Sequence, residues 1–319
     1  MAIGAIYSSP AVVNGVVYIG SDDFNLYALN ATTGALIWKY NIGSSVDSSP
    51  AVANGVVYVS GSSSLMALDA STGALIWSQP VGGGFVSSPA VANGVVYVSS
   101  IRRVWALNAG TGQVLWESAD VGVDFQSVPA VGNGMVYVGD SSYGIVSALD
   151  AGTGNVVWTY RTGYYIESSP AVANGIVYIG SMDYNLYALN ASTGAVIWAY
   201  QVGPINCRSI RAACGPAVAN GVVYTQSIFG VYAVDASTGA LIWTKYIEGN
   251  SAPTVANGVL YFGSAYNFTY IFALDAGTGA QLWRYTTGGE VDSSQTIVNG
   301  IVYSGSTDGN VYAFHLPGH

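Results

Sequence analysis

Short apolar segments alternate with small polar turn residues along the whole chain. Residues 168–200, for example, read SSPAVANGIVYIGSMDYNLYALNASTGAVIWAY. Each apolar segment spans only a few residues, is rich in β-branched and aromatic side chains, and is bounded by Gly, Asn, Ser or Pro, which is the pattern of strands joined by tight turns. No segment has the 3.6-residue period of an amphipathic helix. The pattern therefore predicts an all-β protein.

An Asn-Gly pair marks the same point in every copy of an internal repeat. The pair begins at eight positions, Asn14, Asn54, Asn93, Asn133, Asn174, Asn220, Asn257 and Asn299. Asn-Gly favours a two-residue type I′ hairpin turn, because both central residues of that turn need a positive φ. A Tyr follows in every copy at one fixed position, namely Tyr18, Tyr58, Tyr97, Tyr137, Tyr178, Tyr224, Tyr261 and Tyr303. The chain is therefore built from eight copies of a unit of about 40 residues.

A complete copy divides into four predicted strands. In the example above they are PAVA, IVYIG, LYALN and AVIW. Four antiparallel strands in a repeat of about 40 residues are typical of a propeller blade. We therefore expect one domain over residues 1–319, an eight-bladed β-propeller with four-stranded antiparallel blades. The predicted units are 10–49, 50–88, 89–128, 129–169, 170–215, 216–252, 253–294 and 295–319, the last closed with 1–9.

The end of the unit resembles the PQQ-type repeat, which is named for the pyrroloquinoline-quinone dehydrogenases. Residues 28–38 read ALNATTGALIW and match the motif A-x-(D/N)-x-x-T-G-x-x-x-W. The motif tryptophans are Trp38, Trp77, Trp116, Trp158, Trp198, Trp243 and Trp283. The resemblance implies that each Trp packs between adjacent blades against the T-G turn of its neighbour. A structural role fits the side chain, because a large flat ring buries much area.

The eighth copy is incomplete. It ends with VYAFHLPGH and lacks both the T-G turn and the Trp strand. We expect the first nine residues to help close the ring, because closure removes a free sheet edge. That segment is short and contains no Trp, so the outer strand of blade 8 is predicted to be weak or missing.

The charge content limits the kinds of partner. Only 8% of residues are charged, the net charge is −9, and the chain has eight Lys and Arg residues. Nucleic-acid binding needs clustered cations that displace counterions, so eight scattered cations argue against it. No apolar run approaches 18 residues, so no membrane span is predicted. We expect a monomer whose partner is a protein or a surface polymer.

The two cysteines bear on the compartment. Cys207 and Cys214 lie in the irregular segment PINCRSIRAACG. They form either a loop-closing disulfide, which we favour, or two reduced thiols; a disulfide would indicate an oxidising compartment. The N-terminus lacks the basic and apolar segments of a signal peptide. We expect an extracytoplasmic protein, periplasmic, secreted or on the cell surface, with the signal peptide absent from this chain.

The turns divide the predicted ring into two faces. The constant face carries the Asn-Gly and T-G turns, and the variable face carries the turns between second and third strands and the connections between blades. Loops on a rigid scaffold commonly carry function, and aromatic and Arg side chains suit recognition. The predicted partner surface comprises Arg102, Arg103, Asp124, Phe125, Tyr164, Tyr165, Arg208 and Arg211. The alternative is that exposed loops simply carry the charges and that recent duplication explains the uniform face.

No catalytic residue is predicted. The only histidines are His315 and His319 at the C-terminus, so a His-based acid–base or zinc site is not expected. Asp47, Glu167 and Asp292 precede the innermost strands and are weak candidates for a cation site at the mouth of the central channel. No other metal site is predicted.

The PQQ-repeat resemblance implies two functions. The dehydrogenases oxidise alcohols with PQQ and Ca²⁺, but they have longer loops, a disulfide between adjacent cysteines and a Trp beneath the cofactor. Here the cysteines are not adjacent, and seven of the eight Trp belong to the blade motif. We therefore expect no cofactor and a non-catalytic binding scaffold similar to those of the BamB type. The alternatives are a PQQ/Ca-dependent alcohol or sugar dehydrogenase and a lectin-like module that uses the loop aromatics.

Overall fold

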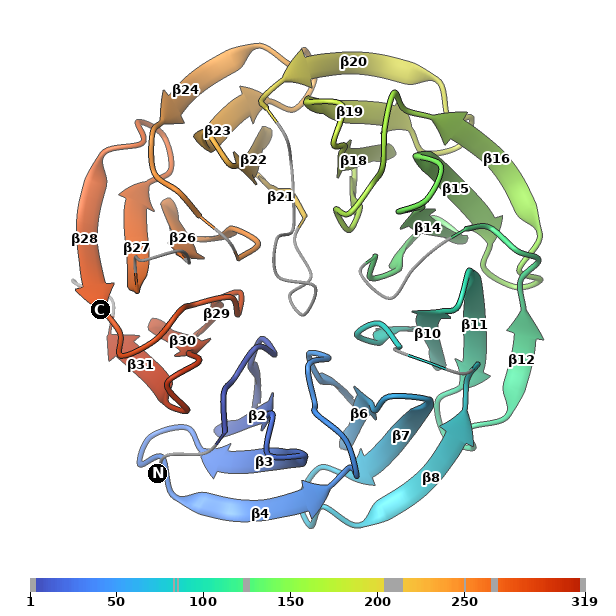
Figure 1. Ribbon diagram of the computed structural model, residues 1–319, viewed down its shortest axis with the longest axis vertical. Helices are drawn as coiled ribbons and strands as arrows, with labels where there is room; N and C mark the ends of the chain where they lie inside the picture. Colours follow the sequence, from blue (N-terminus) through green and yellow to red (C-terminus); the bar gives the residue numbers. More distant parts are fainter. Residues whose placement is uncertain are drawn as a thin grey trace.

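Eight small antiparallel sheets surround a central axis in the manner of propeller blades (Figure 1). This computed structural model describes residues 4–82, 84, 86–122, 127–203, 215–249, 251–264 and 269–315. Within these ranges the chain forms 31 strands, and no helix has the length and apolarity needed to cross a membrane. The predicted all-β, eight-bladed architecture is confirmed.

The first four blades each contain four strands. Blade 1 consists of β1 (Ala11–Val13), β2 (Val16–Gly20), β3 (Asn25–Asn30) and β4 (Leu36–Asn41). Blade 2 consists of β5 (Ala51–Ala53), β6 (Val56–Ser60), β7 (Ser64–Asp69) and β8 (Leu75–Pro80). Blade 3 consists of β9 (Ala90–Ala92), β10 (Val95–Ser100), β11 (Arg103–Asn108) and β12 (Val114–Glu117). Blade 4 consists of β13 (Ala130–Gly132), β14 (Met135–Gly139), β15 (Ile145–Asp150) and β16 (Val156–Arg161).

The next three blades repeat this plan, and the last is shorter. Blade 5 consists of β17 (Ala171–Ala173), β18 (Ile176–Gly180), β19 (Asn185–Asn190) and β20 (Val196–Gln201). Blade 6 consists of β21 (Ala217–Ala219), β22 (Val222–Ser227), β23 (Gly230–Asp235) and β24 (Leu241–Lys245). Blade 7 consists of β25 (Thr254–Ala256), β26 (Val259–Gly263), β27 (Tyr270–Asp275) and β28 (Gln281–Thr286). Blade 8 consists of β29 (Thr296–Val298), β30 (Ile301–Gly305) and β31 (Val311–His315).

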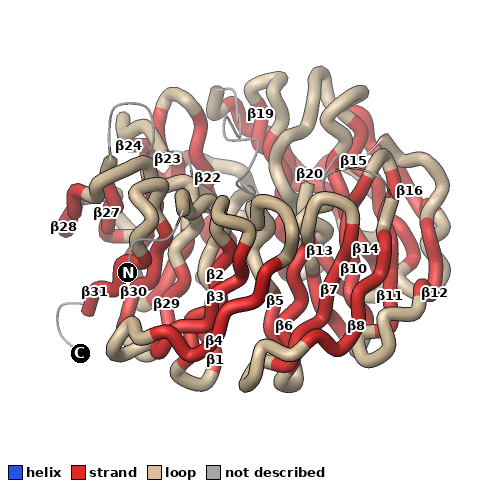
Figure 2. The backbone as a smooth tube through the Cα atoms, turned by 60° about the horizontal axis from the view of Figure 1, so that its bottom comes forward, coloured by secondary structure: helices blue, strands red, loops and turns tan. Residues whose placement is uncertain are grey.

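The strands of a blade follow one another from the axis to the rim, each antiparallel to the last. The Asn of every Asn-Gly turn has a φ between +50° and +53° and is followed by a Gly with positive φ, as a type I′ turn requires. Because consecutive strands are antiparallel, successive turns lie on opposite edges of the ring (Figure 2). The constant face and the variable face are therefore separate surfaces.

A single carbonyl oxygen joins each of six pairs of neighbouring blades. At the first junction, the carbonyl of Ala70 accepts hydrogen bonds from the Tyr18 hydroxyl and the Trp38 indole, both at 3.0 Å. The centroids of these two rings are 5.8 Å apart, so the donors also pack against each other. Equivalent Tyr and Trp donors converge on the carbonyls of Ala109, Ala151, Ala191, Ala236 and Ala276. We call this arrangement the Tyr–Trp clamp.

The Gly of the T-G turn in blades 2 to 7 packs on the Trp of the preceding blade. A Cβ on Gly112 would lie 2.6 Å from the Trp77 ring, which is closer than real Cβ contacts. Gly112 also has a φ of +73°, in the left-handed region that favours glycine. Gly34 in blade 1 has a φ of +69°, but a Cβ there would meet no atom within 4 Å. The difference arises because the eighth repeat supplies no Trp to blade 1.

Serine side chains at the start of the innermost strands link blades near the axis. The Ser9 N–H donates to Ser49 Oγ at 2.9 Å, and the Ser49 N–H donates to Ser88 Oγ at 2.8 Å. The Ser294 N–H donates to Ser9 Oγ at 2.9 Å. This last bond connects blade 8 to blade 1 and joins the two ends of the chain on the inside of the ring.

The N-terminal segment lies against blade 8 as a connecting loop. Ile6 is fully buried against Ile19, and its N–H donates to the Ser306 carbonyl at 3.2 Å. Residues 4–9 form no strand, and the blade 8 sheet has three strands in the described part of the chain. The described N-terminal residues therefore occupy the position of a loop between blades instead of adding an outer strand to β31.

An aromatic side chain covers the blade 7 Trp where the eighth repeat has no T-G turn. The Phe314 ring lies 5.6 Å from Trp283 and 4.9 Å from Tyr285, measured between centroids. Position 314 is Leu or Val in the other seven copies. The larger ring thus provides contact area at the junction between blades 7 and 8.

A pair of glycine substitutions tests the contribution of the Trp packing. Gly112→Ala should destabilise the protein by about 1–3 kcal/mol more than Gly34→Ala, because both lose a left-handed Gly but only the first overpacks a Trp. Denaturant or thermal midpoints of the two variants measure the difference. Equal losses would show that the Trp contact contributes nothing beyond the backbone conformation.

Candidate functional site

Exposed aromatic side chains gather on the loops of the variable face. They are Phe24, Tyr143, Tyr164, Tyr165, Tyr184, Phe229 and Tyr246. The T-G turns of the constant face expose small residues, Ala, Ser, Thr and Gly. The two faces of the ring therefore differ in chemistry as well as in loop length.

Two of these aromatic residues have a backbone conformation that favours glycine. Phe24 has a φ of +73° and Tyr184 one of +78°, and their side chains are 49% and 47% exposed. Blade 8 has Gly309 at the same position, with a φ of +78°. A side chain in the left-handed region costs about 1–2 kcal/mol. Glycine would therefore fit these turns with less strain than the aromatic residues do.

A Tyr–Asp pair fixes each of these two turns. Asp23 accepts hydrogen bonds from the Asn25 N–H and the Tyr27 hydroxyl, and Asp183 accepts one from the Tyr187 hydroxyl at 2.6 Å. Burial, together with the hydrogen bond to Asp23, raises the pKa of Tyr27 to about 12. The phenol therefore remains a donor at neutral pH, and the turn keeps its shape.

Both predicted arginines of blade 3 are paired with carboxylates. Arg102 Nε lies 2.8 Å from Asp120 Oδ2, and Arg103 Nη1 lies 2.8 Å from Glu117 Oε1. The Arg102 guanidinium also lies 5.6 Å from the centroid of the Tyr143 ring. Arg102 therefore connects a loop of blade 3 with a turn of blade 4 on the variable face.

The predicted tyrosine pair lies between the turns of blades 4 and 5. The rings of Tyr164 and Tyr165 are 4.2 Å apart between centroids, and both are exposed. The Thr162 hydroxyl donates to the Tyr164 carbonyl at 2.6 Å, and the Met182 N–H donates to the Tyr165 carbonyl at 2.9 Å.

The remaining predicted residues lie outside the described residues: Asp124, Phe125, Arg208, Arg211, Cys207 and Cys214.

The three acidic candidates for a cation site are not brought together. Asp47, Glu167 and Asp292 precede the innermost strands of blades 2, 5 and 8, which lie on different sides of the ring (Figure 1). In the ranges that the structure describes, no group of three or more His, Cys, Asp or Glu side chains is placed to hold a metal ion. Equivalent positions of distant blades face the central axis from different directions and therefore stay apart.

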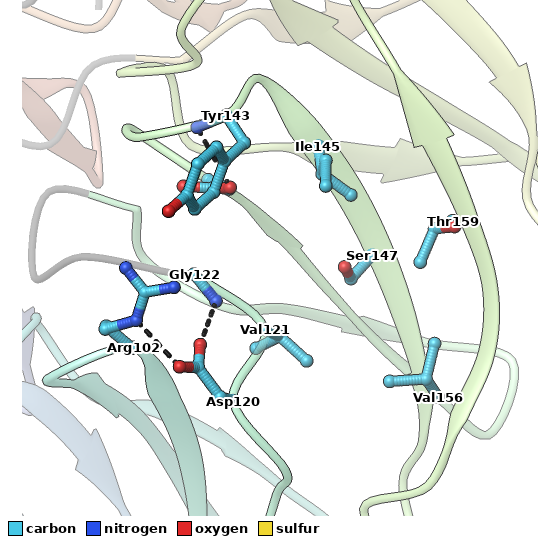
Figure 3. A pocket seen from close by; sticks show the side chains of 10 residues that line it. Arg102, Asp120, Val121, Gly122, Tyr143, Ile145, Ser147, Val156 and Thr159 are labelled. Atoms are coloured by element: carbon cyan, nitrogen blue, oxygen red, sulfur yellow. Dashed lines mark hydrogen bonds and ion pairs between the residues drawn. The ribbon is translucent and has the colours of Figure 1, made fainter.

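A cavity of about 260 Å³ opens between blades 3 and 4 on the variable face (Figure 3). Its walls come from two loops of blade 3, the turn between β14 and β15, and strands β15 and β16. Arg102 and Tyr143 lie on one side of it, and Ser147 and Thr159 lie on the other.

Two polar residues of the cavity wall are almost completely buried. Asp140 and Ser147 are each 1% exposed. The Asp140 carboxylate accepts hydrogen bonds from the backbone N–H groups of Ser142 at 2.6 Å and Tyr143 at 3.1 Å. Ser147 Oγ has no hydrogen-bond partner among the described residues. A buried hydroxyl without a partner costs about 1–3 kcal/mol.

The sequence predictions missed both residues, although a comparison of the eight copies contains the signal. Ser147 stands where the other seven copies have a large side chain, namely Tyr27, Met66, Trp105, Tyr187, Tyr232, Phe272 and Tyr312. Asp140 stands where five other blades have a fully buried serine, namely Ser21, Ser100, Ser181, Ser264 and Ser306. Both departures occur in the same blade and face the same cavity.

Burial raises the pKa of Asp140. The backbone hydrogen bonds from Ser142 and Tyr143 and the charge of Arg102 act in the opposite direction, and the charge of Asp120 acts with burial. The ionised form of this carboxyl is therefore less favourable in the folded protein than in the unfolded chain.

Comparison with known structures supports the fold. The crystal structure of BamB from Moraxella catarrhalis is 21% identical, with 99% of each chain covered and a TM-score of 0.81. The computationally designed Ika8 protein is 17% identical, covering 99% of this chain and 98% of its own, with a TM-score of 0.85. Quinohemoprotein alcohol dehydrogenase ADHIIG from Pseudomonas putida HK5 is 18% identical, covering 95% of this chain and 70% of its own, with a TM-score of 0.72. At these identities the likeness shows the fold alone.

The fold and the repeated motif define an eight-bladed β-propeller of PQQ-type repeats. A family model described as outer membrane protein assembly factor BamB matches residues 2–64, 22–126, 101–248 and 208–317. The chain belongs to this family. None of the curated proteins compared with it matches the sequence.

Replacing Asp140 by the serine that other blades have at this position tests how much the buried carboxyl destabilises the folded protein. Asp140→Ser should raise the free energy of unfolding at neutral pH, because the raised pKa of Asp140 makes ionisation unfavourable to folding. Below the ordinary pKa of 3.8 the carboxyl is protonated in the folded and in the unfolded chain, and its contribution to the free energy of unfolding is most favourable there. This contribution is lost as the pH rises through the pKa of Asp140 in the folded protein. Denaturation midpoints should therefore differ most near pH 7 and converge below about pH 4. A pH-independent difference would contradict this assignment.

Proposed function

We propose that this protein is a non-catalytic scaffold that binds another protein, or a surface polymer, outside the cytoplasm through its variable face. The ring supplies a rigid frame, and the loops between strands supply the contacts. The proposed compartment and the proposed class of partner are consistent with the family, which is described as an outer membrane protein assembly factor.

The observation that carries this proposal is the pair of strained, exposed aromatics, Phe24 and Tyr184. Each keeps a large side chain at a left-handed position where Gly309 shows that glycine fits. The side chains are about half exposed, so burial in the folded chain does not offset the whole strain. Strain of this kind persists mainly at functional positions. Contact with a partner would bury these rings and account for their retention.

Other side chains of the variable face have the composition of a recognition surface. Tyr143, Tyr164 and Tyr165 add further exposed rings, and Arg102 adds a guanidinium held in place by Asp120. Tyr and Arg are enriched among the residues that dominate interface energies. These residues come from blades 3 to 5, which lie next to one another in the ring (Figure 1).

The dehydrogenase alternative lacks a platform for the cofactor. Six of the motif tryptophans donate to the next blade in Tyr–Trp clamps, and Trp283 packs against Phe314. Trp105 packs into the core shared by blades 2 and 3. All eight indoles are therefore engaged in packing within the ring, and PQQ would have no Trp on which to stack.

Removal of the strained aromatics tests the proposed binding surface. Phe24→Gly combined with Tyr184→Gly should weaken partner capture by about tenfold or more, because two exposed aromatic side chains of the binding face are lost. Stability should stay equal or increase, because glycine relieves the left-handed backbone. Capture of cell-envelope proteins and surface polymers from the source organism by immobilised protein, followed by affinity measurement on the identified partner, provides the readout.

A matched control lies on the constant face. Gln113→Ala combined with Asn155→Ala changes two exposed side chains beside T-G turns and should leave capture unchanged. A partner that binds the Gly variant, and also a Tyr164→Ala, Tyr165→Ala variant, as tightly as the parent would contradict the assignment of the variable face.

The non-catalytic assignment has its own test. Protein incubated with PQQ and Ca²⁺ should show no dye-linked oxidation of primary alcohols or aldoses and no cofactor binding by absorbance titration, because no indole is free to stack on the quinone. Turnover that depends on both additions would overturn the assignment, and a known PQQ dehydrogenase serves as the positive control.

A further inference from the structure

The junction between blades 3 and 4 lacks a pair of large side chains that fills other junctions. At the junction between blades 4 and 5, Tyr160 of the outer strand meets Tyr187 of the next third strand, with ring centroids 5.6 Å apart. An equivalent Tyr pair fills the junction between blades 7 and 8. The corresponding residues between blades 3 and 4 are Ser118 and Ser147. Two small side chains therefore leave space where two phenol rings pack elsewhere.

The backbone keeps this space open. Strand β12 ends at Glu117 after four residues, whereas β16 and β20 have six residues each. The chain then turns back over blade 4, where Gly122 approaches the Asp140 carboxylate so closely that a Cβ would lie 2.5 Å from Oδ2. The result is the cavity of about 260 Å³ between this loop and β15.

The inner wall of the cavity presents hydrogen-bonding capacity that the protein does not use. Ser147 Oγ can both donate and accept, and it has no partner among the described residues. The carboxylate of Asp140 has about four acceptor positions, and the backbone of Ser142 and Tyr143 supplies two donors. A ligand that places hydroxyl groups here would satisfy both side chains.

The mouth of the cavity adds donors and an aromatic ring. Arg102 binds Asp120 through Nε and also interacts with Tyr143, and its guanidinium places further N–H donors at the mouth of the cavity. Tyr143 is exposed and lies beside Arg102. Val121, Ile145 and Val156 provide apolar surface along the wall. The cavity thus combines several polar groups with apolar patches, as small-molecule sites do.

The charges of the cavity argue against an anion. Two carboxylates, Asp120 and Asp140, and one guanidinium, Arg102, line it. A phosphate or carboxylate ligand would meet net repulsion. A purely apolar ligand would leave Ser147 and Asp140 without partners, which is unfavourable.

We propose that the cavity between blades 3 and 4 binds a neutral sugar unit, either a free monosaccharide or the end of a neutral glycan. A pyranose ring carries hydroxyl groups around its edge and C–H groups on its faces, which match the polar groups and the apolar patches of this wall. The cavity shares Arg102 and Tyr143 with the proposed partner surface, whereas the strained aromatics Phe24 and Tyr184 lie on blades 1 and 5. Variants of Phe24 and Tyr184 therefore test the partner surface, and variants of Ser147 test the cavity.

Binding by the intact protein is tested with defined sugars. Glucose, galactose, mannose and N-acetylglucosamine are titrated by calorimetry and by ligand-observed NMR, together with neutral oligosaccharides that end in the same units. At least one neutral sugar should bind, and comparison of the free and chain-terminal forms identifies the source. Glucuronate should bind at least about tenfold more weakly than the preferred sugar, because of the two carboxylates.

Three substitutions place the binding in this cavity. Ser147→Tyr restores a side chain that blades 5 and 6 carry at this position and should abolish binding by filling the space. Ser147→Ala should weaken binding by about tenfold or more without loss of thermal stability, because the hydroxyl has no hydrogen-bond partner in the described part of the chain. Met66→Tyr introduces the same side chain at the equivalent position of blade 2. It is the matched control and should leave binding unchanged.

The proposal is overturned if no neutral sugar binds the parent protein, or if glucuronate binds better than every neutral sugar. It is also overturned if the parent binds a sugar and both Ser147 variants bind it equally well. Circular dichroism and the thermal midpoint establish that each variant is folded, and Ser147→Ala decides the outcome if Ser147→Tyr disturbs the ring.

Discussion

At six junctions, neighbouring blades of this protein are held side by side by one carbonyl oxygen that accepts two hydrogen bonds from the preceding blade. A carbonyl has two lone pairs, and a buried indole N–H and phenol O–H each need a partner. The Tyr–Trp clamp satisfies all of them at once, for example at Ala70. It also requires a glycine in the T-G turn, because the Trp ring occupies the space of a Cβ. One interaction therefore fixes the Tyr, Trp and Gly of each repeat.

This clamp explains why a defect at one junction does not open the ring. Blades 3 and 4 lack the outer pair of large side chains, yet Tyr97 and Trp116 still donate to the Ala151 carbonyl at 3.3 and 3.0 Å. The cavity lies toward the variable face, beside the loops, while the clamp lies beside the T-G turn. Blade 8 is the opposite case, because the Trp strand that supplies one donor of the clamp is missing there. Blade 8 is joined to blade 1 through Ser9, Ser294 and the buried Ile6 instead.

The clamp also explains how much the sequence could predict. The number and strand order of the blades followed from motifs that lie within a single repeat, so local pattern was sufficient. The cation hypothesis for Asp47, Glu167 and Asp292 gave no site among the described residues. The repeat order showed that the three residues come from different blades, but sequence cannot measure the distances between their side chains. The cavity was missed because it depends on small residues, Ser118 and Ser147, at two positions of neighbouring blades where other junctions have large side chains. A missing side chain leaves no motif.

The loops of the variable face can differ between copies of a duplicated repeat through random drift alone. The free-energy cost that a residue imposes on folding distinguishes drift from function. Drift does not favour an aromatic residue at a φ of +78° where Gly309 fits, as at Tyr184, nor a buried carboxyl such as Asp140 where other blades have serine. The unpaired Ser147 hydroxyl adds a third cost. All three lie on or beside the variable face, whereas the T-G turns of the constant face satisfy their own polar groups, as Asp69 does with Ser71 and Thr72. The clustering of unfavourable features on one face is therefore the physical argument that this face binds something.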